Sequence, residues 1–138
     1  MKALLVAFDG SKPSIRAFQY AAERARGRKD IEIHIIYAQQ GVLPSKQVTK
    51  GMIEDWQARR RKAALSVKVV RELKKRTKAQ VHVLTGDPAT EILEFAHKNP
   101  IGEIVMGTRG MGRLKGLFMG SVATKVAHLA TVPVTLVK

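Results

Sequence analysis

The chain has 138 residues, 45% of them hydrophobic and 5% aromatic, and 25 basic against 11 acidic residues give it a formal net charge of +14. This length suits one domain with a sizeable core, and the absence of cysteine excludes disulfides, thiolate catalysis and zinc–thiolate sites. The positive charge would attract nucleic acid, anionic membranes or phosphorylated small molecules, although charge runs on helices are also typical of solvated surfaces.

The predicted elements alternate between strands and helices. The first strand is the apolar run Ala3–Phe8, whose lack of polar alternation is typical of a strand covered on both faces. This run is too short for a signal peptide core or a membrane span, so we expect a cytoplasmic protein without membrane insertion. A helix follows, capped by Ser11 with Pro13 in its first turn and ended by Gly27. Ile31–Ala38, rich in β-branched residues, predicts the second strand.

The rest of the chain continues this alternation. Gln39–Gly51 contains glycine, proline and serine without a clear period, which predicts a connection. A long helix follows, and its apolar face is predicted to consist of Ile53, Trp56, Ala63, Val67, Val70 and Leu73. The later predicted elements are a strand at Gln80–Leu84, a helix capped by Asp87 and ended by Asn99 and Pro100, a strand at Glu103–Met106, a helix at Met119–Ala130 and a strand at Val132–Val137.

Strands that are separated by helices indicate right-handed βαβ units. We therefore expect an α/β fold, a doubly wound parallel sheet with helices on both faces. In such sheets, ligands bind beyond the carboxyl ends of the strands, where the winding reverses. Asp9, Ala38, Gly86 and Gly107 each follow a predicted strand end, so we expect them to border one crevice.

The stretch Gly107–Ser121 holds five of the eleven glycines and no carboxylate. Its glycines fit neither the dinucleotide fingerprint nor the Walker A loop. Gly107 and Gly110 would let the backbone turn sharply and approach a ligand, while Gly120 and Ser121 would place bare N–H groups at a helix start, which suits phosphate. A flexible surface loop is the competing interpretation.

Side chains of the same region add to the phosphate interpretation. Arg109, Arg113 and Lys115 supply positive charge, and an acidic residue there would repel phosphates. The hydroxyls of Ser121 and Thr124 could add hydrogen bonds.

The spacing Gly-x2-Gly-x9-Gly-Ser at Gly107, Gly110, Gly120 and Ser121 resembles the motif of the ATP-binding branch of the universal stress protein family. Three other segments, VAFDGS, TGDPATEIL and VPVTLVK, resemble that family's first strand, third helix opening and last strand. The resemblance implies one nucleotide-binding domain over residues 1–138, with five parallel strands in the order 3-2-1-4-5. It also implies a homodimer in which the final strands, Val132–Val137, meet.

The resemblance also implies an adenine-nucleotide site. Ala7 and Asp9 would lie beside the nucleoside and Ala38 near the adenine, with the ribose and phosphates against the glycine-rich segment. For Asp9, binding of a phosphate-bound Mg²⁺ and capping of the first helix are further interpretations. The complete set of implied nucleotide-binding residues is Ala7, Asp9, Ala38, Met106, Gly107, Arg109, Gly110, Gly120, Ser121 and Val122.

Catalytic chemistry has little support in the sequence. Residues 107–125 contain no carboxylate or histidine, and fast ATP hydrolysis needs a group that positions water. We therefore expect no catalytic residue and at most a weak ATPase. His34, His82, His97 and His128 have no metal-ligand spacing and are interpreted as structural.

Two functions remain after these exclusions. The resemblance implies a nucleotide-responsive stress regulator that binds ATP, ADP or AMP, with or without Mg²⁺. The alternative is a basic nucleic-acid-binding protein, kept as a secondary activity because the sequence lacks a helix-turn-helix or a basic–aromatic pattern.

Overall fold

The computed structural model describes residues 3–39, 50, 51, 54, 68, 71, 72, 75, 78–109 and 119–138. Residues 50, 51, 54, 68, 71 and 72 are helical, but the apolar face predicted for the long helix lies outside the described residues, as does most of the connection predicted at Gln39–Gly51. None of the helices in the described ranges is long and apolar enough to cross a bilayer. The cytoplasmic location stays a prediction.

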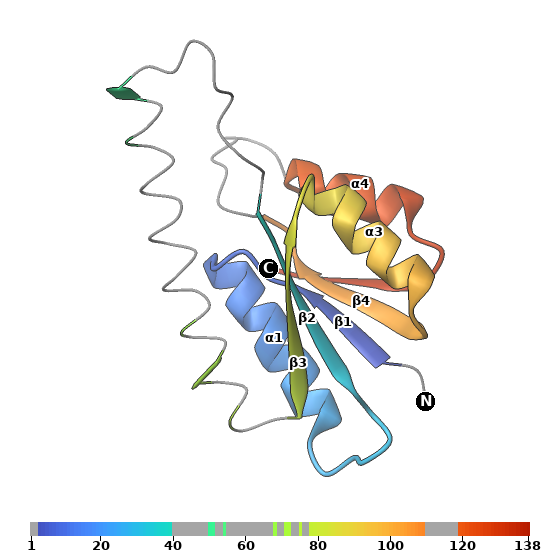
Figure 1. Cartoon of the computed structure of the whole chain (residues 1–138). Coiled ribbons are helices and arrows are strands. Elements are labelled where there is room, and N and C mark those ends of the chain that lie inside the picture. The colour runs from blue at the N-terminus through green and yellow to red at the C-terminus, as the bar shows by residue number, and fades with distance from the viewer. Residues whose placement is uncertain are drawn as a thin grey trace.

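Five parallel strands form one sheet in the order β3-β2-β1-β4-β5, which confirms the expected doubly wound α/β fold. The winding reverses between β1 and β4. Helix α1 covers one face of the sheet, and α3 and α4 cover the other (Figure 1). In chain order the elements are β1 (Ala3–Ala7), α1 (Lys12–Ala25), β2 (Ile33–Gln39), β3 (Ala79–Thr85), α3 (Pro88–Lys98), β4 (Ile101–Gly107), α4 (Ser121–Leu129) and β5 (Val134–Val137).

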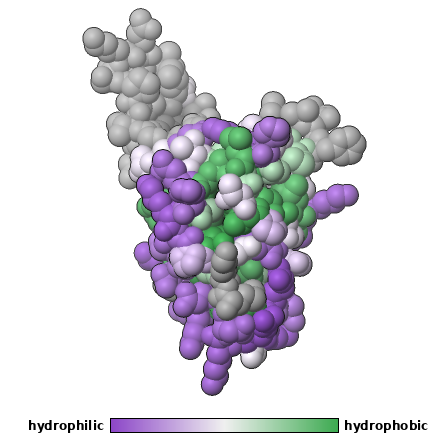
Figure 2. Space-filling model, turned by 90° about the vertical axis from the view of Figure 1, so that its right-hand side faces the viewer, coloured by the Kyte–Doolittle hydropathy of each residue, from purple (hydrophilic) through white to green (hydrophobic). Residues whose placement is uncertain are grey.

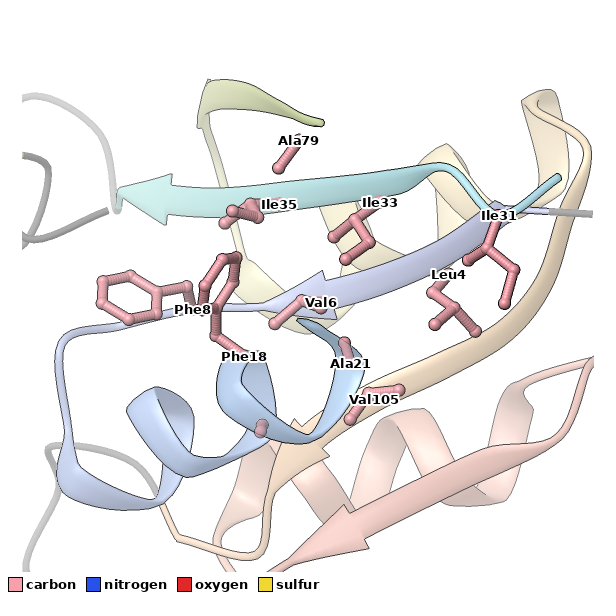
Figure 3. Packing of buried hydrophobic residues seen from close by; sticks show 11 residues of the cluster. Leu4, Val6, Phe8, Phe18, Ala21, Ile31, Ile33, Ile35, Ala79 and Val105 are labelled. Carbon is pink, nitrogen blue, oxygen red and sulfur yellow. The ribbon is translucent and has the colours of Figure 1, made fainter. Parts of the chain in front are cut away.

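The central strand β1 is buried along its whole length, which explains its unbroken apolar sequence. Because side chains alternate between the two faces of a strand, β1 contributes side chains to a hydrophobic core on each face of the sheet. Leu4 and Val6 pack with Phe18 of α1 on one face (Figure 3). Leu5 packs on the other face in a core that includes Val126 of α4.

Side-chain caps mark the N-termini of α1 and α3. The hydroxyl of Ser11 accepts from the N–H of Ser14 at 3.3 Å and caps α1. Asp87 caps α3 by accepting from the N–H of Thr90 at 3.0 Å. Both caps agree with the sequence prediction, since a cap joins residues only three apart.

Most predicted strand and helix boundaries differ from the structure by one or two residues, and two of these differences lie at α4 and at the sheet edge. Helix α4 begins at Ser121 and not at Met119, because Gly120 has an extended backbone with φ −70° and ψ 164°. Strand β5 begins at Val134 and not at Val132, since Pro133 has no N–H to contribute to the sheet.

Candidate functional site

A cleft opens beyond the carboxyl ends of β1, β2 and β4, against the first turns of α1, α3 and α4. Its volume is about 170 Å³, less than the roughly 300 Å³ of pockets that enclose a whole drug-sized ligand. A ligand of nucleotide size would therefore extend beyond the described walls. Nine of the ten predicted site residues line this cleft, and Gly110 lies outside the described residues: Ala7, Asp9, Ala38, Met106, Gly107, Arg109, Gly120, Ser121 and Val122.

The sequence prediction missed several lining residues. They could have been found from side-chain periodicity, because Ile36 lies two residues before Ala38 on the same face of β2 and Ile92 lies one helical turn after Pro88. The lining residues not predicted are Phe8, Ser11, Ser14, Ile36, Pro88, Ile92 and Ala123.

Gly86 does not line the cleft, so its predicted place at the crevice is wrong. The strand order explains the error, because β3 is an edge strand and β2 separates it from β1. Gly86 has a φ of 151°, and a Cβ there would lie 2.4 Å from Oε1 of Glu91. The absence of its side chain therefore serves the turn into α3.

The cleft has an apolar floor and a polar rim. Side chains of Ala7, Ala38 and Met106 belong to the core between the sheet and the helices α3 and α4. Asp9 and Ser121 supply polar groups nearer the helix starts. This division suits a ligand that has one flat apolar part and one charged part.

Gly107 lines the cleft, but the sharp turn predicted there is wrong. It lies at the end of β4, and the described glycines with positive φ are Gly10, Gly27 and Gly86, so it makes no sharp turn. A Cβ at position 107 would lie 2.6 Å from Cβ of Pro13 and 3.1 Å from the backbone N of Ser14. Gly107 thus lets the first turn of α1 pack directly on the end of β4.

The start of α4 differs from the starts of α1 and α3, because Gly120 occupies the N-cap and offers no side-chain cap. The N–H of Gly120 is not bare as predicted, since it donates to the carbonyl of Thr108 at 2.6 Å. The hydroxyl of Thr124 is also committed, because it donates to the carbonyl of Gly120 at 2.9 Å. The uncapped amides therefore belong to the first turn that begins at Ser121.

Asp9 is the one acidic residue among those that line the cleft within the described part of the chain. Its Oδ1 accepts from the N–H of Ser11 at 2.9 Å, and Ser11 caps α1. Asp9 is therefore not the helix cap, but it orients the residue that is. Burial and, to a smaller degree, the charge of Asp9 raise the pKa of Tyr37 in β2.

An exposed contact joins the N-cap residue of α3 to the second turn of α4. Nζ of Lys125 lies 3.5 Å from Oδ2 of Asp87 and 3.4 Å from Oγ1 of Thr90. Hydrogen bonds from Thr90, first from its N–H and then from its hydroxyl, hold the pKa of Asp87 below its usual range, and Lys125 adds to this effect.

No cluster of three or more histidine, aspartate or glutamate side chains suited to a metal ion occurs among the described residues.

The universal stress protein family model matches residues 1–138. The chain belongs to the universal stress protein family. Family membership confirms the resemblance seen in the sequence, whereas the ATP-binding branch stays a prediction.

Relatives and solved structures of the family agree with this assignment. The chain is 30% identical to the universal stress protein YxiE of Bacillus subtilis over 98% of this chain and 97% of the relative. The structure of the universal stress protein UspA from Lactobacillus plantarum matches with a TM-score of 0.79 and 21% identity over 99% of this chain and 97% of that one. The universal stress protein from Archaeoglobus fulgidus in complex with dAMP matches with a TM-score of 0.64 and 26% identity over 100% and 98% of the two chains.

The close packing at Gly107 predicts that Gly107→Ala destabilises the fold by about 1–3 kcal/mol, because the added methyl would overlap the backbone and ring of Pro13. Urea unfolding followed by circular dichroism measures the change. The neighbouring Thr108→Ala is the control, since it keeps both backbone hydrogen bonds of Thr108. Equal stability of Gly107→Ala and the wild type would contradict this assignment of Gly107.

Proposed function

We propose that the cleft binds an adenine nucleotide, with ATP, ADP and AMP as candidates, and that this universal stress protein acts as a nucleotide-responsive stress regulator. The observation that carries the proposal is the convergence on one cleft of nine residues from separate segments, between an apolar floor and an uncapped helix start. Neither part alone would indicate a nucleotide. Their combination matches the two halves of such a ligand.

The phosphate would bind at the first turn of α4. The amides there have no side-chain cap, and α4 has no acidic residue in its first turn. A helix start of this kind favours an anion through its N–H groups and its dipole. Gly120 contributes by exposing this turn, while its own N–H stays bonded to Thr108.

The base would bind against the apolar floor. Ala7 and Ala38 are small, so a planar ring system can approach the strand ends, and Met106 and Ile36 provide apolar contact. The Archaeoglobus fulgidus relative was solved in complex with dAMP, which supports an adenine nucleotide as the ligand class. Asp9, which lines the cleft, would accept from a ribose hydroxyl or hold a Mg²⁺ that neutralises phosphate charge.

We further propose that the protein holds ATP with slow or negligible hydrolysis. The described lining includes one carboxylate, Asp9, which already accepts from the N–H of Ser11, and no histidine. Fast phosphoryl transfer needs a group that orients the attacking water and added charge at the γ-phosphate. The lining favours retention over turnover.

The nucleic-acid alternative gains no particular surface from the structure. Fifteen of the 25 basic and ten of the 11 acidic residues are described, so nine of the 14 net positive charges belong to the rest of the chain. Six of those fifteen basic side chains are paired with carboxylates: Arg24, Arg26, Arg28, Lys75, Lys98 and Lys125. Nucleic-acid binding therefore stays a prediction.

If the phosphate binds at the first turn of α4, Ser121→Asp should weaken AMP and ATP binding by at least about tenfold relative to Ser121→Asn. Two like charges about 4 Å apart near a protein surface repel by roughly 4 kcal/mol. A carboxylate at a helix start stabilises the helix itself, so loss of binding cannot come from unfolding. Isothermal titration calorimetry measures the affinities, and thermal unfolding measures the stability.

The asparagine variant is the matched control because it has the same shape as aspartate without the charge. Equal nucleotide affinities of the two variants would contradict a phosphate at the start of α4. Absence of adenine-nucleotide binding by the wild type would contradict the proposed function as a whole.

We also propose a homodimer through the C-terminal strand. Strand β5 is an edge of the sheet, and an unpaired apolar edge invites a partner strand. The N–H of Ile104 donates to the carbonyl of Pro133 and that of Thr108 to the carbonyl of Val137. Alternation along the parallel ladder then directs the N–H groups of Val134 and Leu136 away from β4.

Apolar surface near this edge supports the same proposal. Figure 2 views the molecule from the side on which α4 lies in Figure 1, and apolar side chains gather there inside a hydrophilic border. Leu129, the last residue of α4, is 54% exposed. One partner chain could both pair with β5 and cover this apolar surface.

The dimer proposal predicts that Val134→Pro shifts the protein toward monomer, because proline removes an outward N–H without removing a bond to β4. Val134→Ala is the control, since it shortens the side chain but keeps the amide. Analytical ultracentrifugation over a concentration series measures the dissociation constants. A monomeric wild type, or equal dissociation constants for the two variants, would contradict a dimer through β5.

A further inference from the structure

Two histidines meet on the sheet face that α3 covers. Nδ1 of His34 in β2 lies 3.0 Å from Nε2 of His82 in β3. Their rings stack with centroids 5.3 Å apart at 22°. The ring of Phe95 from α3 packs against both, with centroids 5.6 Å from His34 and 4.7 Å from His82. The pair thus joins β2, β3 and α3.

The 3.0 Å separation admits one proton between the two facing nitrogens. Oε2 of Glu32 lies 3.8 Å from Nε2 of His34, which favours a proton on that nitrogen. In the neutral pair, His82 then donates through Nε2 to the lone pair on Nδ1 of His34. One further proton is tolerated, because an imidazolium still donates to a neutral ring. When both rings are charged, Nδ1 of His34 and Nε2 of His82 each carry a proton, so the hydrogen bond is lost and the two N–H groups repel each other.

Few charged side chains lie near the histidine pair among the described residues. Glu32, directly before β2, is the carboxylate that faces His34. On β3, the residues on the same face next to His82 are Gln80 and Leu84, which carry no charge. From α3 the contact is the uncharged ring of Phe95, while Glu94 and Lys98 of that helix pair with each other at 3.6 Å and His97 is exposed.

The histidine pair lies at the edge of the sheet. Strand β3 is an edge of the sheet, held on one side only by β2. Helix α3 follows β3 directly, and its residues Pro88 and Ile92 line the cleft. We propose that the His34–His82 pair is an acid-sensitive contact that holds β3 to β2 and α3 when at most one ring is charged and loosens that edge when both are charged.

The sign of the pH dependence follows from His82. Burial, and then the charge of His34, lower the pKa of His82 below the ordinary value of about 6.5. An opened β3 therefore binds more protons than the closed one as soon as the pH falls below about 6.5. The attachment of β3 is at full strength above that pH and weakens as the pH falls through the lowered pKa.

Amide hydrogen exchange tests the proposal at pH 7.5 and 5.5 after correction for intrinsic exchange rates. For one proton taken up on opening, the opening constant of β3 amides rises up to about tenfold over this range, while that of β1 amides does not. In His82→Gln, which keeps an N–H donor but cannot titrate, the rise disappears. In the control His97→Gln, the rise remains.

The proposal is wrong if β3 and β1 respond equally to pH, or if His82→Gln keeps the rise. Ring ¹⁵N chemical shifts of the wild type provide a measurement that needs no variant. The ring of His82 is expected to titrate below the ordinary histidine value of about 6.5. A His82 ring that titrates at or above this value would also overturn the proposal, and neither experiment depends on nucleotide binding.

Discussion

The backbone of Thr108 holds together the parts of the molecule that form the site. Its N–H donates to the carbonyl of Val137 at the end of β5, and its carbonyl accepts from the N–H of Gly120 before α4. The end of β4 thereby fixes both the edge of the sheet and the start of a helix. One residue earlier, Gly107 lets α1 pack against β4 without a side chain in between.

Three helix starts surround the cleft, and they are not equivalent. Ser11 and Asp87 fill the starts of α1 and α3 with their own side chains, so those amides are satisfied within the protein. Gly120 leaves the first turn of α4 without such a cap, and no acidic residue stands in that turn. An anion is therefore favoured at one of the three starts. The strand ends next to it are apolar.

Sequence reasoning succeeded where the interactions are local and failed where they join distant segments. The caps at Ser11 and Asp87 involve residues three apart, so a short pattern predicts them. The packing of Gly107 depends on Pro13, and the His34–His82 contact depends on the register of two strands, neither of which a spacing reveals. Gly86 shows the same limit, because following a strand end does not tell which strand lies at the edge.

We propose that the start of α4 contributes binding energy to a phosphate while the strand ends bind the base. Calorimetric titration of the wild type with adenosine, AMP and ATP separates these two contributions. Hydrogen bonds to a charged group contribute roughly 1.5–3 kcal/mol each, so AMP should bind at least about tenfold more tightly than adenosine. Equal affinity for adenosine and AMP, or no binding of any of the three, would contradict the account.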